Sequence, residues 1–308
     1  MIKDVVDIEL PVSEHLRIQK NEIRNGESGK KLSIVTGTHG DELEGQLLVY
    51  KLASYFSENI NLLDGTLSLY PALNPLGIES LTRGLPGFDL DMNRVFPGNE
   101  DGSMVEHMAH VIIEDLSDSD IVIDVHASNI FLTEVPQVRV NEVSKDKLLP
   151  LALMLNTDFV WIHSASTVLE STLAYSLHAR GIDTLVVEMG VGMRLTERLS
   201  DNLFIGVLNL MKSLGMYKGE IEEEIRKPIV SSDPEDVIYL NAPEAGIFLK
   251  KKEAGSNVRE GETIGLLLDP LRGRIISEIK AQCDGLLFTV REYPVVDQGS
   301  LMGRILRR

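Results

Sequence analysis

Three apolar segments, each leading into a potential ligand or base, constrain most strongly how this chain can fold. Residues 32–36, 121–126 and 184–188 are short hydrophobic runs, and His39, His126 and Glu188 follow or end them. Runs of this length bounded by turn-forming residues are typical of buried strands. In open α/β sheets, binding and catalytic side chains gather at the carboxyl ends of the strands. The pattern therefore predicts a polar site at one edge of a sheet.

Segments with strand and helix character alternate along the chain up to residue 214. Further strands are expected at residues 66–71 and 158–162, and helices are expected at residues 42–57, 103–116, 147–155, 170–180 and 195–214. Such alternation is typical of an α/β fold. We therefore predict a mixed sheet flanked by helices.

The composition changes after Gly215. A charged, proline-bearing stretch covers residues 218–234, and short strand-like runs follow at residues 239–240, 246–249, 263–268, 273–276, 285–290 and 301–305. Because one hydrophobic core seldom grows beyond roughly 250 residues, a chain of 308 residues is expected to form two domains. We predict an α/β domain at residues 1–228 and a smaller all-β, barrel-like domain at residues 229–308.

A histidine and a glutamate three residues apart, His39 and Glu42, follow the first of these strands. If a helix begins near Asp41, both side chains lie on one turn and can converge on a single cation. A catalytic zinc usually has three protein ligands and one open position, and His126 can supply the third. The alternative for His126 is a core histidine that hydrogen-bonds to the backbone. With Cys283 as the only cysteine, a metal site must use imidazole and carboxylate ligands, which suit zinc but also accept cobalt, nickel or manganese.

Glu188 ends a hydrophobic strand, and Gly190 and Gly192 follow it closely. Burying a charge is costly unless the charge is paired, so Glu188 is expected either in a structural ion pair or as a base beside the metal. Between the metal motifs, Arg94 offers a planar fork for a carboxylate and Arg83 could stabilise an oxyanion. The alternative for both arginines is a solvated loop charge.

Four motifs in this order resemble the succinylglutamate desuccinylase/aspartoacylase family, which belongs to the zinc carboxypeptidase clan. They are G-x-H-G-D-E at residues 37–42, D-x-N-R-x-F-P-G at 91–98, D-x-H at 124–126 and V-E-x-G at 187–190. The resemblance extends over about residues 30–200. It implies one Zn2+ per chain, with the ligands His39, Glu42 and His126, and it implies that Glu188 is the general base and acid.

By the same resemblance, Arg83 would polarise the scissile carbonyl, and Asn93 and Arg94 would grip the substrate carboxylate. Asp91 would hydrogen-bond a zinc-bound imidazole and fix its orientation. The residues after His126, from Asn129 to Arg139, do not indicate which acyl group is accepted.

The expected activity is hydrolysis of the amide bond in a small N-acyl amino acid or related N-acyl amine. Three alternatives stay open. The first is a carboxypeptidase or peptide amidase of the same clan, and the second is a binding protein with a vestigial metal site. The third is a carrier domain fused to an enzyme. Residues 258–265 and 279–285 resemble the half-repeats of biotinyl/lipoyl barrels, but the turn at residues 269–273 has no lysine to modify.

The net charge of −17 argues against nucleic-acid or anionic-membrane partners, because both require a basic surface. Residues 1–7 lack the features of a signal peptide, and no apolar stretch reaches spanning length, so a cytoplasmic location is expected. A homo-oligomer is a further expectation. His107 and His110 are expected on a polar helix face. Trp161 and His163 could line a pocket or belong to a core strand.

Overall fold

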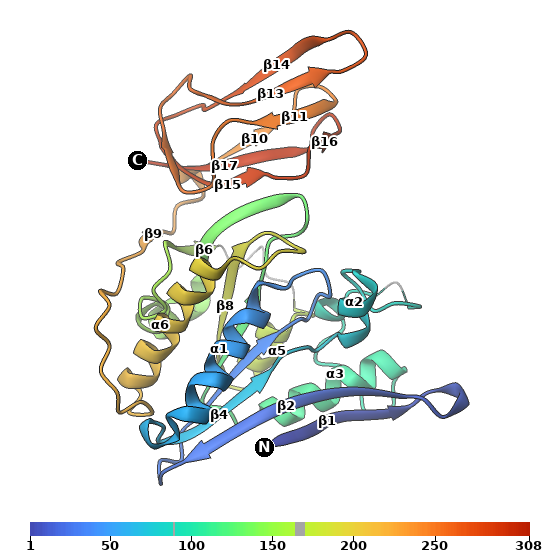
Figure 1. Cartoon of the computed structure of the whole chain (residues 1–308), viewed down its shortest axis with the longest axis vertical. Coiled ribbons are helices and arrows are strands. Elements are labelled where there is room, and N and C mark those ends of the chain that lie inside the picture. The colour runs from blue at the N-terminus through green and yellow to red at the C-terminus, as the bar shows by residue number, and fades with distance from the viewer. Residues whose placement is uncertain (89, 164–169) are drawn as a thin grey trace.

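The structure is a computed structural model that describes residues 1–88, 90–163 and 170–308. It confirms the predicted fold class, a mixed α/β sheet flanked by helices with a further β-sheet region at the carboxyl-terminal end (Figure 1). The helices are α1 Glu44–Glu58, α2 Pro75–Ser80, α3 Met104–Leu116, α4 Lys145–Ala152, α5 Leu173–Ala179 and α6 Glu197–Ser213.

One sheet of 13 strands runs through the molecule, in the order β1-β2-β4-β3-β5-β8-β6-β15-β17-β10, with β12 beside β15 and β7 and β9 beyond β6. Its strands are β1 Ile2–Glu9, β2 His15–Asn25, β3 Lys31–Thr36, β4 Gly65–Tyr70, β5 Ile121–His126, β6 Leu132–Asn141, β7 Phe159–His163, β8 Asp183–Gly190, β9 Ile229–Ser231, β10 Val237–Asn241, β12 Ser256–Val258, β15 Gly285–Arg291 and β17 Leu301–Arg307. Strands β4, β3, β5 and β8 are parallel, whereas β6 is antiparallel to β8.

Strand alternation decides which side of the sheet carries each polar side chain. Ile123 and Val125 of β5 and Leu185 and Val187 of β8 join the hydrophobic core that α1 and α6 cover. Successive side chains of a strand point to opposite faces. The side chains at residues 124, 126, 186 and 188 therefore face the side where α3 and α5 pack. This places the end of β5 and the end of β8 on one surface.

The predicted helix at 42–57 begins later than expected, at Glu44. His39 and Glu42 lie in the turn before α1, where the Glu42 amide donates to the His39 carbonyl at 3.3 Å. The expectation that both lie on the first turn of a helix is therefore wrong, although the turn still brings their side chains together. The hairpin of β1 and β2 and the long strand β6 were not predicted from the sequence.

The carboxyl-terminal strands divide between two sheets. Strands β10, β12, β15 and β17 continue the large sheet through the pairing of β15 with β6. The others form a second sheet of 4 strands in the order β14-β13-β11-β16, namely β11 Gly246–Lys250, β13 Thr263–Asp269, β14 Arg274–Lys280 and β16 Val295–Val296. Phe248, Leu267, Leu287 and Ile305 pack between the two layers. The domain boundary at residue 228 stays a prediction, and the large sheet crosses it.

No helix in the described ranges is both long enough and apolar enough to cross a membrane.

The turn after β3 packs directly against the start of α2, and this generates a stability prediction. A Cβ atom on Gly40 would lie 2.0 Å from the carbonyl carbon of Gly77, which is backbone and cannot rotate away. We expect Gly40→Ala to lower the free energy of unfolding by about 1–3 kcal/mol, the usual cost of overpacking. Urea denaturation measures this change. Gly29→Ala is the matched control, because a Cβ there meets nothing within 4 Å. Equal midpoints for the two variants would contradict the packing argument.

Candidate active site

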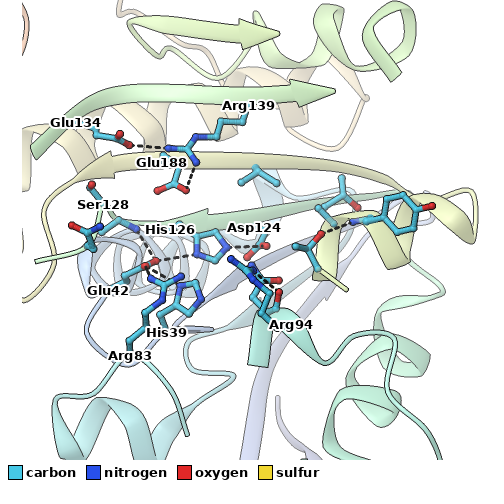
Figure 2. A pocket seen from close by; sticks show the side chains of 18 of the residues that line it. His39, Glu42, Arg83, Arg94, Asp124, His126, Ser128, Glu134, Arg139 and Glu188 are labelled. Carbon is cyan, nitrogen blue, oxygen red and sulfur yellow. Dashed lines mark hydrogen bonds and ion pairs between the residues drawn. The ribbon is translucent and has the colours of Figure 1, made fainter. Parts of the chain in front are cut away.

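Three buried side chains converge at the carboxyl ends of β3 and β5. His39 and Glu42 come from the turn after β3, and His126 is the last residue of β5 (Figure 2). One ligand atom from each lies within 4.8 Å of the others. In the part of the chain that the structure describes, this is the only group of three or more such residues that could hold a metal ion. His107 and His110 of α3 do not belong to it.

The two imidazoles present the same nitrogen to the centre of the cluster. His39 Nδ1 lies 2.8 Å from Glu42 Oε1, and His126 Nδ1 lies 2.9 Å from Glu42 Oε2. On the far side of each ring, Nε2 of His39 donates to Asp91 Oδ1 at 3.0 Å, and Nε2 of His126 lies 3.0 Å from Asp124 Oδ2. A carboxylate on Nε2 fixes the ring and leaves Nδ1 for a metal. The donor set therefore fits a divalent cation of the zinc type.

The pKa values of the cluster show that its carboxylates favour a positive charge between them. Burial opposes protonation of His126, but Asp124 and Glu42 outweigh it and raise the pKa of this imidazole well above its usual value. The pKa of His39 is also raised, because hydrogen bonds to Asp91 and Glu42 outweigh the effect of burial. Burial would raise the pKa of Glu42, yet its bonds with His126 and His39 hold that pKa far below the usual range. A metal cation would satisfy the same carboxylates and displace the Nδ1 protons.

Glu188 lies beside this cluster on the next strand, β8, where it pairs in register with His126. Its carboxylate Oε1 is 3.2 Å from Nη1 of Arg139. Burial raises the pKa of Glu188 to about 7, with Arg139 and His126 opposing the rise and Glu134 and Glu42 adding to it. A carboxyl group with a pKa near neutrality can both accept and return a proton at physiological pH.

Arg83 and Asp91 contact the metal-ligand candidates. Nη1 of Arg83 donates to Glu42 Oε1 at 2.8 Å, and Nη2 lies 3.4 Å from Asp91 Oδ2. The pKa of Asp91 is held far below its usual value, because its bond with His39 and the positive charges of Arg83 and Arg94 outweigh burial. Asp91 also accepts a hydrogen bond from the backbone amide of Asn93, which fixes the turn that carries Asn93 and Arg94.

Asn93 and Arg94 reach the cavity by different routes. Asn93 Oδ1 accepts a hydrogen bond from the Leu173 amide at 2.9 Å, so this side chain joins the turn to the start of α5. Its Nδ2 group is the part that could donate to a substrate. Arg94 is exposed, and its Nη1 donates to the Asn93 carbonyl at 2.7 Å. No carboxylate within the described ranges forms an ion pair with Arg94, although its charge acts on Asp91 through space, and Arg94 lines the cavity.

A cavity of about 1240 Å3 covers the site. Of the eight residues predicted from the sequence, all except Asp91 line it, namely His39, Glu42, Arg83, Asn93, Arg94, His126 and Glu188. Asp91 lies behind His39. Residues of β6, β7 and α5, including Arg139, His163 and Tyr175, form other parts of the wall. Trp161, by contrast, packs against Phe159 and Phe288 in the core.

Three residues at the site were not among the predicted site residues. Asp124 precedes His126 by two positions, so the D-x-H motif already places both on one face of a strand. That signal was available in the sequence. Arg139 and Glu134 come from β6, which was not predicted as a strand. The contact of Arg139 with Glu188 depends on β6 pairing with β8, and no local motif reports such a pairing.

Comparisons with known proteins show the family of this chain. The family described as Succinylglutamate desuccinylase/Aspartoacylase catalytic domain matches residues 28–214. The N-alpha-acetyl-L-2,4-diaminobutyric acid deacetylase of Halomonas elongata is 25% identical over 288 residues, which is 88% of this chain and 80% of that protein.

Solved structures share the fold over the whole chain. The product-bound ectoine utilization protein EutE from Ruegeria pomeroyi superposes with a TM-score of 0.85 at 19% identity, over 100% of this chain and 95% of that one. A succinylglutamate desuccinylase/aspartoacylase from Rhodobacter sphaeroides has a TM-score of 0.81 at 23% identity, over 99% and 95% of the two chains. The family match covers more than half of the sequence and all of the predicted site residues. The chain belongs to the succinylglutamate desuccinylase/aspartoacylase family.

Proposed function

We propose that this protein is a zinc-dependent deacylase that hydrolyses the amide bond of a small N-acyl amino acid or related N-acyl amine. The observation that carries the proposal is the convergence of His39 Nδ1, His126 Nδ1 and the Glu42 carboxylate beside Glu188. Family members are deacylating hydrolases, and the curated relative is a deacetylase of an N-acetylated amino acid. The cavity of about 1240 Å3 over this cluster agrees with a small-molecule substrate.

His39, Glu42 and His126 would hold the cation, with Asp91 and Asp124 orienting the two imidazoles. When bound, zinc supplies a Lewis acid that acidifies water and polarises a carbonyl oxygen. Glu188 would accept the proton of the attacking water and then deliver it to the departing amine. The amide C–N bond breaks, and the products are a carboxylic acid and a free amine.

The arginines of the 83–94 segment would bind and orient the substrate. Arg83 lies against Glu42 and could donate to the carbonyl oxygen as negative charge develops there. Arg94, with the Nδ2 group of Asn93, would hold the substrate carboxylate, since its guanidinium is not neutralised by a described acid. Holding the substrate in this way makes the attack effectively intramolecular. In a chain with a net charge of −17, such local arginines are what attracts an anionic substrate.

The first prediction tests the activity and the base together. The zinc-loaded protein should release free amine from one class in a panel of N-acetyl, N-succinyl and longer N-acyl amino acids. Glu188→Gln should fold and bind zinc to the same stoichiometry but lose on the order of 100-fold or more in kcat, the usual scale for a general base. Metal analysis and amine release provide the measurements.

Two results would overturn the proposal. Turnover restricted to short peptides, included in the same panel, would assign the protein to the peptidases of the clan. Full activity of Glu188→Gln would remove Glu188 from the mechanism.

The second prediction concerns pH. A base works only when ionised, and the pKa of Glu188 is raised to about 7. As pH falls below this value, the ionised fraction drops, so kcat/KM should fall and approach a tenfold loss per pH unit. A bound dication would favour the ionised form of Glu188, so the fall in kcat/KM would then occur at lower pH. A kcat/KM that rises between pH 7 and pH 5 would contradict the assignment.

The third prediction concerns Arg94. Arg94→Ala should raise KM about tenfold or more for substrates with a free carboxylate, because a charge-assisted hydrogen bond to substrate is lost. The matching methyl esters should be affected much less. Arg272→Ala is the control, since Arg272 pairs with Asp269 in a hairpin of the second sheet and does not line the cavity. Equal losses on acids and esters would mean that Arg94 does not bind the carboxylate.

A further inference from the structure

We propose that Arg139 is a positioning residue for Glu188, that Glu134 of β6 holds Arg139 in place, and that Arg304 of β17 holds Glu134 from the carboxyl-terminal strands. The inference rests on the proposed role of Glu188 as the base. It assigns a part in the active-site geometry to strands that lie beyond residue 229, outside the region matched by the family's catalytic domain.

Four charged side chains alternate in sign from the site to the carboxyl-terminal strands. Glu188 Oε1 lies 3.2 Å from Arg139 Nη1, and Arg139 Nη2 donates to Glu134 Oε2 at 3.1 Å (Figure 2). Arg304 Nη1 then donates to Glu134 Oε1 at 2.6 Å. Each of these guanidinium nitrogens contacts a different carboxylate oxygen. The contacts therefore fix the orientation of the side chains as well as the distances between them.

Glu134 is the fixed point of this network. It is 2% exposed, and a buried carboxylate is costly unless its oxygens are satisfied. Besides the two arginines, Gln137 Nε2 donates to Oε2 at 2.9 Å and Thr289 Oγ1 donates to Oε1 at 3.2 Å. Both oxygens therefore have two donors. A carboxylate held in this way has little freedom to move. Because Arg139 donates to it, the guanidinium of Arg139 is held in place as well.

An aromatic ring supports both arginines. The guanidinium carbons of Arg139 and Arg304 each lie 5.9 Å from the centre of the Trp161 ring. Cation–π contacts of this kind favour Arg over Lys and keep the guanidinium planes in place. Trp161 is itself fixed by its contacts with Phe159 and with Phe288 of β15.

The network follows the hydrogen-bonded rows of one continuous sheet. Gln137 is in register with Glu188, Glu134 with Thr289, and Thr289 with Arg304. The distance between the site and β17 is therefore set by backbone pairing across β8, β6, β15 and β17. Such pairing is far stiffer than a contact between two separately folded units.

Arg139 is better placed to position the base than to bind a substrate anion. Its Nη1 and Nη2 atoms each face a carboxylate, so its charge is already balanced. Arg94, which also lines the cavity, forms no ion pair with a carboxylate among the described residues. A misplacement of a catalytic group by about 1 Å can cost on the order of 100-fold in rate.

The test compares kcat, KM, zinc content and thermal stability in full-length variants. Arg139→Met should lower kcat about 10- to 100-fold while KM changes less than about threefold and zinc content stays at the wild-type level. Arg304→Met should lower kcat as well, though less. In the Arg139→Met background, Arg304→Met should cause no further loss, because its effect passes through Arg139.

Conservative variants separate positioning from general stability. Arg304→Lys keeps a charge that can make the single contact with Glu134, so it should recover most of the kcat that Arg304→Met loses. In Arg139→Lys the single ammonium group cannot contact both carboxylates as a planar guanidinium does, so kcat should stay low. These variants also serve if the methionine variants fail to fold. Arg307→Met, on the exposed end of β17, is the matched control and should behave as wild type.

Three outcomes would overturn the inference. Additive losses in the double variant would show that Arg304 does not act through Arg139. Recovery of kcat by Arg139→Lys would show that a single positive charge is enough and that the two-sided contact of the guanidinium is not required. If wild type is active and Glu188→Gln is not, but Arg139→Met matches Arg307→Met, then only this inference fails. Silence of the wild-type enzyme across the whole substrate panel would instead reject the proposed function, and the inference with it.

Discussion

The carboxylate of Glu42 is the interaction on which the rest of the site depends. It is 4% exposed, and its two oxygens face the Nδ1 atoms of His39 and His126. A buried carboxylate of this kind requires positive charge, and two imidazoles that face it require their outer nitrogens to be held by Asp91 and Asp124. The site is thus a set of carboxylates around two buried imidazoles, and its centre could hold a cation. Strands β3 and β5 bring its two halves together because they are parallel neighbours.

Much of this arrangement follows from local sequence. A buried parallel strand ends at the sheet edge where its neighbours end, so the polar residues after 32–36, at 126 and at 188 had to meet. Alternation along β5 and β8 then decides that His126 and Glu188 share one face. The predicted start of the first helix failed, because Gly40 packs against the backbone of Gly77 and keeps the chain in a turn until Glu44. Such a contact between distant segments has no local signal.

The unpredicted contacts around Glu188 depend on β6. This strand lacks the uninterrupted apolar run of its neighbours, since Glu134, Gln137 and Arg139 alternate with buried valines. A polar strand at the middle of a sheet is costly unless its charges pair with one another, and here they pair across β8, β15 and β17. Pairings between segments as far as 170 residues apart are a property of topology and cannot be read from local periodicity.

The continuous sheet connects the carboxyl-terminal strands directly to the active site. An appended module joined by a linker would transmit little to the active site, because relative motion of two units would break any precise contact. Here β15 pairs directly with β6, and β6 pairs with β8, so a displacement of β17 must disturb the strand that carries Glu188. Glu134 is buried and Arg304 is partly buried, so separating them would leave both charges poorly compensated. The packing of the carboxyl-terminal strands and the position of Glu188 therefore depend on the same contacts.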